Sequence, residues 1–163
     1  MKNMIGRRGQ GAMEYLMTYG WAILVVMIVG IVMWQLGIFN MGGTTVTATG
    51  FAKIKPQLAG TGLTTAGVFK SIFTNGVGTT IIVHNGGSTE PSITDGTTAC
   101  TSFTVNPETV SAGQNFVLTA SGCATGEPGE VYDLTVSIPY TVSIGTTSSF
   151  HRESGSIRGP MEQ

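Results

Sequence analysis

Four charged side chains near the N-terminus are the residues of this sequence whose spacing points most directly to chemistry. Lys2, Arg7 and Arg8 come first, and Glu14 follows. No charged residue then occurs from Tyr15 to Gly37. A carboxylate deep in a bilayer costs about 2.5 to 3.5 kcal/mol, whereas the N-terminal end of a helix dipole favours one at the interface. Glu14 is therefore either an interfacial carboxylate or a carboxylate whose cationic partner is formed later.

The uncharged run that follows Glu14 reads YLMTYGWAILVVMIVGIVMWQLGIF. It is about 25 residues long, or about 37 Å as an α-helix. This length is enough to cross a hydrocarbon core about 30 Å thick. The run is apolar all round, which is typical of a helix that is buried on every side. Because basic residues precede the run and no cation follows it before Lys53, we expect the N-terminus to lie in the cytoplasm and the remainder outside.

Three other membrane-related interpretations compete for this segment. A secretory signal peptide has an apolar region of about 7 to 15 residues and a small-residue cleavage site, and this run is too long for that class. A twin-arginine signal is disfavoured because Arg7-Arg8 is followed by Gly-Gln rather than by apolar residues. A single-span membrane anchor remains open, since basic residues before an apolar helix are common.

The segment RRGQGAMEY, residues 7–15, resembles the class III signal peptide of archaeal type IV pilins. In that family a membrane peptidase cuts after a basic leader and just before a Gln, and a Glu lies four residues beyond that Gln. The resemblance places the cut between Gly9 and Gln10, and Gln10 and Glu14 have the family's spacing. One departure is Ala12, where many members of the family have Ser.

The resemblance implies a structural role with several partners. The precursor would lie in the cell membrane, and a prepilin peptidase would trim it. A pilus assembly platform and its ATPase would then polymerise it into an extracellular type IV pilus-like filament, a helical homo-oligomer that serves adhesion or surface attachment. The implied domains are a leader at residues 1–9, a transmembrane and filament-core helix at 10–41, and an extracellular head at 42–163.

Cleavage at this position would change the electrostatics of the helix end. The leader carries Lys2, Arg7 and Arg8, the basic residues of the peptidase recognition segment, which also hold the N-terminus in the cytoplasm. The net charge would go from −1 to −4, because three of the eight basic residues leave and all nine acidic residues stay. The new α-amine of Gln10, with a reference pKa of about 7.7 to 8.0, would be a cation close to Glu14. The resemblance implies that this pair registers one subunit against its neighbour.

The sequence after Phe39 is rich in Thr, Ser and Gly, and its short apolar segments are separated by turn signals. Asn75-Gly76 and Asn85-Gly86 are turn dipeptides. The pattern predicts an α+β chain, in which a long hydrophobic N-terminal helix is followed by a small immunoglobulin-like antiparallel β-sandwich head. The predicted strands are Val68–Thr74, Thr79–His84, Ser102–Val105, Gln114–Ala120, Val131–Ile144 and Thr146–Ile157.

The longest of these predicted strands shows the clearest alternation of apolar and polar residues. Its phase continues beyond Pro139, which predicts an edge strand or a bend there, because proline cannot donate a ladder hydrogen bond. The side chains predicted to share one face are Tyr132, Leu134, Val136, Ile138, Tyr140, Val142 and Ile144.

Cys100 and Cys123 are the only cysteines. An even count in a chain that we expect to be exported favours a disulfide, which would stabilise the fold by roughly 3 to 4 kcal/mol in the chain-entropy description. Two buried free thiols are the alternative.

No catalytic or nucleic-acid-binding pattern accompanies these features. The only histidines are His84 and His151, and no hydrolase, zinc or phosphate-loop motif occurs. The lack of Lys and Arg between Ser71 and His151 removes the basic patch that phosphate binding needs. We therefore expect no enzyme activity, no cofactor or metal and no nucleic-acid partner. The alternative to a filament subunit is a single-span membrane-anchored surface protein with an extracellular β-sandwich binding module.

Overall fold

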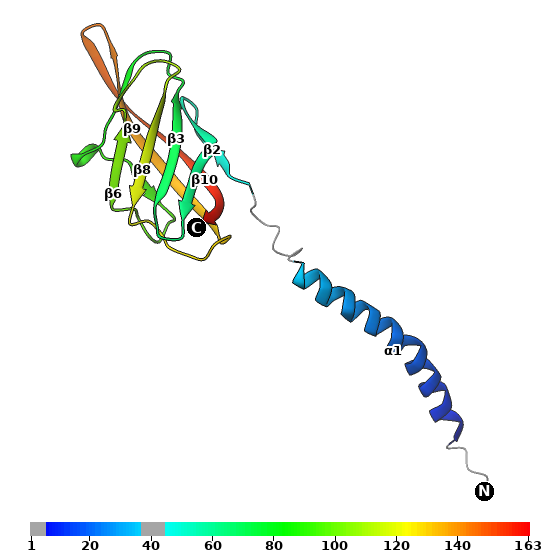
Figure 1. Ribbon diagram of the computed structural model, residues 1–163. Coiled ribbons are helices and arrows are strands. Elements are labelled where there is room, and N and C mark those ends of the chain that lie inside the picture. The colour runs from blue at the N-terminus through cyan, green and yellow to red at the C-terminus, as the bar shows by residue number, and fades with distance from the viewer. Residues whose placement is uncertain (1–5, 37–44) are drawn as a thin grey trace. The chain divides into compact units, whose positions relative to one another are not determined.

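The computed structural model describes residues 6–36 and 45–163 (Figure 1). The chain divides into two compact units, Met1–Gly42 and Gly43–Gln163. Within the described ranges, the first unit contains the helix α1 and the second contains ten strands and the short 3-10 helix η2, Gly87–Thr89. The end expected for the long helix, at residue 41, lies outside the described residues.

The helix α1 spans Gly6–Gln35, a length of 30 residues. It contains no proline, and its backbone hydrogen bonds are made within the segment, as an apolar surrounding requires. Gly20 and Gly30 each cost about 1 kcal/mol of helix propensity relative to Ala, and both leave the helix backbone open, because an added Cβ would meet nothing within 4 Å. The final turn is closed by a 2.9 Å bond from the Leu36 N–H to the Val32 carbonyl.

The strands of the second unit form one large, curled and mostly antiparallel sheet. Their bounds are β1 (Thr47–Thr49), β2 (Ile54–Thr64), β3 (Phe69–Asn75), β4 (Ile81–Val83), β5 (Ser92–Thr94), β6 (Ser102–Asn106), β7 (Thr109–Val110), β8 (Asn115–Ser121), β9 (Val131–Ile144) and β10 (Thr147–Glu162). The hydrogen-bonded order is β6-β8-β3-β2-β10-β9-β4-β7, with β1 paired to β10 and β5 paired to β9. The α+β class is confirmed, and the immunoglobulin-like sandwich stays a prediction.

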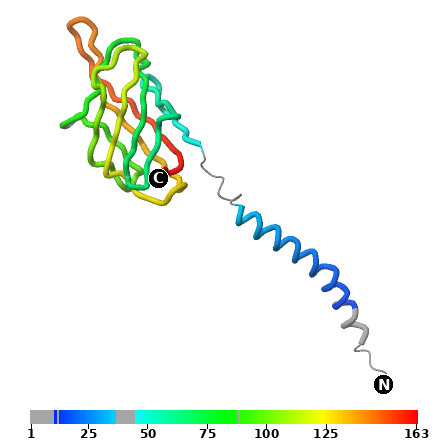
Figure 2. Tube along the Cα trace, in the orientation of Figure 1, coloured from blue at the N-terminus to red at the C-terminus, as the bar shows by residue number. Residues whose placement is uncertain are grey.

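The C-terminal strand β10 joins the two halves of this sheet. It pairs with β9 along residues 147–160 and is antiparallel to it. Its last two residues, Met161 and Glu162, then run parallel to Leu63 and Thr64 of β2. In Figure 2 the red C-terminal segment can be followed between the orange-yellow β9 and the cyan β2. Because the sheet curls, buried side chains from both halves pack into one core, in which the rings of Phe73 and Phe116 stack with centroids 5.5 Å apart.

The alternation predicted for β9 is confirmed along most of the strand. Six of the seven side chains predicted to share a face are buried, and Ile144 is the exception with 70 % of its surface exposed. Ile144 lies at the turn of the β9–β10 hairpin, whose tip projects past the core (Figure 1). Of the two alternatives predicted at Pro139, the edge strand is wrong, because β9 is paired on both sides, with β10 and with β4 and β5, and the bend stays a prediction. The proline lies between the segments paired with β4 and β5.

The strand β2 was not predicted, and its irregularity explains why. Its register against β3 shifts between Gln57 and Gly62, so the residues between them break the alternation that identifies a strand. The bulge is held by the buried hydroxyl of Thr61, which donates to the Gln57 carbonyl at 2.9 Å and lies 2.7 Å from the Ser71 hydroxyl. The short strands β1, β5 and β7 were also not predicted, because two or three residues carry no readable period.

Two buried polar side chains fix loops to the sheet. Asn75, which ends β3, is fully buried, and its amide nitrogen donates to the carbonyls of Thr79 at 2.8 Å and Val110 at 3.0 Å. Its amide oxygen accepts from the Val77 N–H. On β10, the nearly buried Glu153 carboxylate accepts from the backbone N–H groups of Ala52 and Lys53. Such satisfied buried groups are costly to remove, because each partner would be left without a hydrogen bond.

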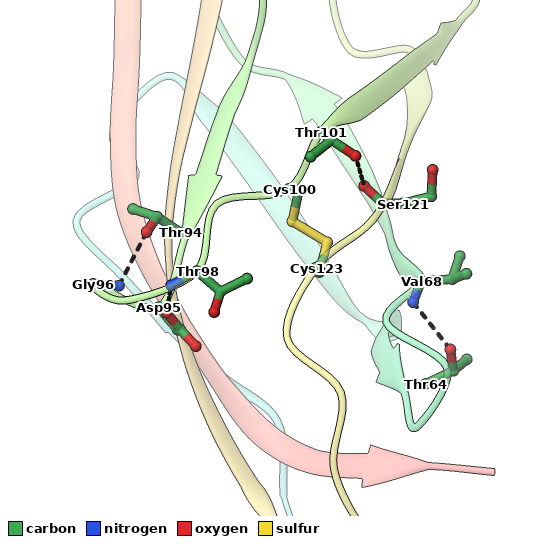
Figure 3. Close-up of a disulfide and its surroundings, with 10 residues drawn as sticks. All are labelled: Thr64, Val68, Thr94, Asp95, Gly96, Thr98, Cys100, Thr101, Ser121 and Cys123. Atoms are coloured by element: carbon green, nitrogen blue, oxygen red, sulfur yellow. Dashed lines mark hydrogen bonds between the residues drawn. A yellow bond between two sulfur atoms is a disulfide. The ribbon is translucent and has the colours of Figure 1, made fainter.

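The predicted disulfide is confirmed, since Cys100 and Cys123 are bonded with their Cα atoms 4.1 Å apart (Figure 3). The bond lies just beyond the β6–β8 pairing, which ends at Ser102 opposite Ser121. The Cys100 N–H donates to the Ile93 carbonyl and the Cys123 N–H to the Gly67 carbonyl. The disulfide therefore ties edge strand β6 and the loop after β5 to the end of β8.

Replacing both cysteines with serine is expected to lower the free energy of unfolding by about 3 kcal/mol, because the closed loop no longer restricts the unfolded chain. The measurement is urea unfolding of the full chain in detergent, followed by the circular dichroism of the β-sheet. Ser121→Ala, next to the disulfide, is the control and should change little. An unchanged midpoint in the double variant would contradict the expectation.

Tyr132 carries a buried hydroxyl without a hydrogen-bond partner among the described residues. Burial, with a smaller contribution from the Glu162 carboxylate, raises the pKa of Tyr132 to about 12. The phenol is therefore protonated in the folded state at pH values where the unfolded chain, with a pKa of about 10, has lost the proton. Stability is retained below pH 10 and is lost as the pH rises towards 12.

Tyr132→Phe is expected to leave stability near pH 7 within about 0.5 kcal/mol of the native value, because the hydroxyl makes no hydrogen bond. Between pH 10 and 12 the variant should lose about 1 kcal/mol less stability than the native chain. Unfolding curves at a series of pH values test this, with Tyr19→Phe on α1 as the control. Identical pH profiles for the native chain and Tyr132→Phe would contradict it.

Candidate functional site

The surface of α1 is the feature of the described chain that most needs a partner. Every side chain that the structure describes on α1 is exposed, including Trp21 at 72 % and Trp34 at 79 %. In the β unit, by contrast, the large apolar side chains are mostly buried in the core. A continuous exposed apolar surface of this kind marks a membrane or protein interaction site. Its burial therefore has to come from lipid or from other chains.

Length and composition suit α1 to a bilayer. Residues Met13–Gln35 form a 23-residue apolar stretch, which is about 35 Å long at 1.5 Å per residue. A helix of this kind at the N-terminus anchors a protein in a membrane or acts as a signal sequence. The tyrosines at its N-terminal end, Tyr15 and Tyr19, stack with ring centroids 4.3 Å apart. Their i, i+4 spacing was present in the sequence, and tyrosine is enriched where lipid meets water.

Most of the residues predicted to direct cleavage and registration lie on the first turns of α1. Lys2 is outside the described residues, and for Arg7, Arg8, Gly9 and Gln10 only the backbone is described, as part of the helix.

Gln10 and Glu14 are four residues apart on this helix, and residues at this spacing lie on the same helix face. The Glu14 side chain is exposed, and its backbone carbonyl accepts a 2.8 Å hydrogen bond from the Thr18 hydroxyl. The roles predicted for these residues stay predictions.

A shallow apolar hollow lies over Gly30 on one face of α1. Its walls are Met27, Ile31, Trp34 and Gln35, at the spacing of neighbouring helix turns. A Cβ atom added at Gly30 would meet nothing within 4 Å, so the hollow is open to an incoming side chain. A glycine that exposes helix backbone in this way permits a second helix to approach closely. The sequence shows the glycine, but its pattern did not predict a hollow walled by large side chains.

The two histidines lie in the β unit and take part in packing. His84 Nε2 is 2.7 Å from the Thr141 hydroxyl, and its ring lies 5.8 Å from that of Phe150. His151 is exposed and stacks on Tyr140 at 5.5 Å. Among the described residues, no three side chains of the kinds that bind metals converge.

Comparisons of the chain with protein-family models, with curated proteins and with solved structures find no match. The function is therefore inferred from the geometry of α1 and of its N-terminal end.

Replacing Leu24 and Ile28 with arginine is expected to release the full chain from membranes, because each charge at the bilayer centre costs about 3 kcal/mol. Leu58→Arg with Ile82→Arg is the matched control, since both residues are exposed on the β unit. Alkaline carbonate extraction measures the result. The expectation fails if the α1 variant resists extraction as strongly as the native chain.

Proposed function

We propose that this protein is a structural filament subunit of the archaeal type IV pilin kind, which a peptidase trims and which polymerises through α1. The observation that carries the proposal is the exposed apolar stretch Met13–Gln35 of α1 with a carboxylate, Glu14, at its N-terminal border. Since α1 begins at Gly6, Glu14 lies beyond the first turn, in which the helix dipole favours an anion, and an isolated anchor therefore gains little from that carboxylate. A polymer does gain from it, provided that a cation on a neighbouring chain lies opposite.

The energetics of helix association support burial of α1 among copies of itself. Lipid tails are as apolar as the helix surface, so association in a membrane depends on close packing and on satisfied polar groups. The hollow over Gly30 offers close packing, since a large side chain of a neighbour can enter it. Methionines such as Met17 and Met27 adapt to uneven neighbouring surfaces. These features favour a bundle of helices over a single helix surrounded by lipid.

Removal of the leader creates the cation that would pair with Glu14. Before the cut, Lys2, Arg7 and Arg8 hold the helix end at the cytoplasmic interface, and they would be very costly to bury in an apolar fibre. After a cut at Gly9, the α-amine of Gln10 is the only new cation, and it lies one helical turn from Glu14. In a staggered bundle, the amine of one subunit would meet Glu14 of the next. A buried pair that is satisfied only in one register selects that register, as polar groups do in coiled coils.

The β unit fits the outside of such a fibre. Its disulfide suits an oxidising extracellular environment, and the charged residues of the whole chain amount to only 10 %. Its two half-sheets pack their buried side chains into a single core, which supports the predicted immunoglobulin-like sandwich as the head. We assign it the adhesive or attachment surface. A prepilin peptidase, an assembly platform and an ATPase are the implied partners.

The alternative is a single-span surface protein that displays the β unit as a binding module. The bilayer-matched length of Met13–Gln35 suits this use equally well. The two proposals differ in what they require of Glu14 and of the leader, so those residues distinguish them.

Glu14→Gln is expected to leave membrane insertion and leader removal intact but to lower filament yield by about tenfold or more, because the Gln10 amine then lacks a charged partner. Glu90→Gln, on the exposed surface of the β unit, is the matched control and should assemble normally. Electron microscopy of sheared surface material gives the yield. Native assembly by Glu14→Gln would refute the registration role.

Gly9→Val is expected to keep the leader attached, because a bulky residue at the cut hinders the peptidase. The uncut protein should then stay in the membrane fraction, detected by immunoblotting, while the cells lack fibres. Gly11→Val, two residues beyond the cut, controls for a general effect of valine on the helix. Normal fibres from cells that carry uncut Gly9→Val would contradict the proposed order of steps.

A further inference from the structure

Three dipeptides in the β unit have the sequence that favours intramolecular succinimide formation: Asn75-Gly76, Asn85-Gly86 and Asp95-Gly96. In this reaction the backbone nitrogen of the glycine attacks the side-chain carbonyl carbon of the preceding residue. Glycine favours the attack because it has no side chain to block the nitrogen and because its backbone is flexible. The three dipeptides differ in how strongly the fold restrains the attacking nitrogen and the side chain that it attacks.

At Asn75-Gly76, hydrogen bonds hold both the asparagine side chain and the glycine nitrogen. The fully buried Asn75 side chain makes three hydrogen bonds to the backbone, to Thr79, Val110 and Val77. The attacking nitrogen of Gly76 is also occupied, since it donates to the Lys53 carbonyl at 2.8 Å. Attack would therefore require local opening of the end of β3, whose free energy suppresses the rate.

Asp95-Gly96 is locked by its own turn, which Figure 3 shows. The Asp95 carboxylate accepts from the N–H groups of Thr97 and Thr98 at 2.7 and 2.5 Å. These hydrogen bonds lower the pKa of Asp95, which keeps the carboxylate in the ionised form that is the poorer target for a nucleophile. The Gly96 N–H donates to the Thr94 hydroxyl at 3.0 Å.

Asn85-Gly86 lacks these restraints. The amide nitrogen of Asn85 makes one long contact, 3.4 Å to the Glu108 carboxylate, and its buried amide oxygen has no hydrogen-bond partner among the described residues. No acceptor in the described part of the chain takes the Gly86 N–H. Gly86 is exposed, and the space around its Cα is open, because an added Cβ would meet nothing within 4 Å. Within the described residues, no short hydrogen bond therefore restrains either the nitrogen or its half-buried target.

We propose that Asn85 is a site of spontaneous deamidation in the folded protein, whereas Asn75 and Asp95 are protected. The Gly86 nitrogen loses its proton and forms a bond to Cγ of Asn85, the bond from Cγ to Nδ2 breaks, and the departing NH2 group takes up that proton and leaves as ammonia. Water then opens the five-membered ring at either carbonyl carbon, which gives aspartate or isoaspartate. No oxidant, metal or enzyme takes part.

The product changes the charge of one surface of the β unit. A neutral amide becomes a carboxylate that faces Glu108, so a hydrogen-bonding contact is replaced by repulsion between like charges. The Glu108 backbone accepts from Val83 of β4 at 2.8 Å, and this repulsion therefore acts next to the pairing of β4 with β7. Isoaspartate would also insert an extra backbone carbon directly after β4. The inference rests on the β unit alone and is independent of how α1 is used.

The test compares the folded and unfolded full chain, incubated in detergent at neutral pH and then digested quickly under mildly acidic conditions. Trypsin is unsuitable, because no Lys or Arg occurs between Ser71 and His151. Chymotrypsin gives a fragment from Thr74 to Phe103 that contains all three dipeptides, and electron-transfer fragmentation locates the mass gain of about one unit and separates isoaspartate from aspartate.

In the folded protein we expect Asn85 to deamidate at least about tenfold faster than Asn75, which corresponds to about 1.4 kcal/mol of local opening free energy. In the reduced, denatured chain the two rates should become similar, because both asparagines then precede a free glycine. Gly86→Ala should suppress the reaction at Asn85, and the open space around Gly86 leaves room for that methyl group. Equal rates in the folded protein, or an intact Asn85 while the denatured chain reacts, would overturn the proposal.

Discussion

Removal of the apolar surface of α1 from water is the constraint on which the rest of this molecule depends. A buried Leu, Ile or Val stabilises by about 1.5 to 3 kcal/mol relative to its exposed state, and the described part of α1 presents such residues on every face. The β unit has a complete core of its own. Two surroundings can therefore bury the apolar surface of α1, a bilayer and a bundle of copies of the helix. In the proposed function, the helix moves from the bilayer into the bundle.

In the proposed scheme, electrostatics decides when that transfer can occur. While the leader is attached, the cations at the helix end would favour the interface of the bilayer and oppose burial in an apolar fibre. After its loss, the helix end would carry one amine and one carboxylate, which could neutralise each other between subunits. The same change would convert Glu14 from a modest cost in the membrane into a source of register. A single covalent cut would therefore alter the relative stability of the two surroundings without any change in the fold of the β unit.

Sequence periodicity was informative where a long segment has one environment. The uncharged run predicted α1, and strict alternation predicted β9 and its buried face, because a period of two over many residues has no other explanation. It failed where tertiary contacts break the period. The Thr61 hydroxyl holds a bulge inside β2, and Pro139 is accommodated in an interior strand because it lies between the segments of β9 that pair with β4 and with β5. The bonds that Asn75 and Glu153 make to distant backbone groups could not be predicted, because they depend on register between strands far apart in the chain. The pairing of the cysteines could be predicted, since two residues allow only one intramolecular disulfide.

The proposal that α1 polymerises only after loss of the leader is tested by the mass of the N-terminal peptide in sheared surface material from cells that make the native protein. We predict that ordered polymers contain only chains that begin at Gln10, with the leader absent. Polymers whose subunits still carry the leader would contradict the proposal, because three cations would then be buried in the apolar interior of the fibre.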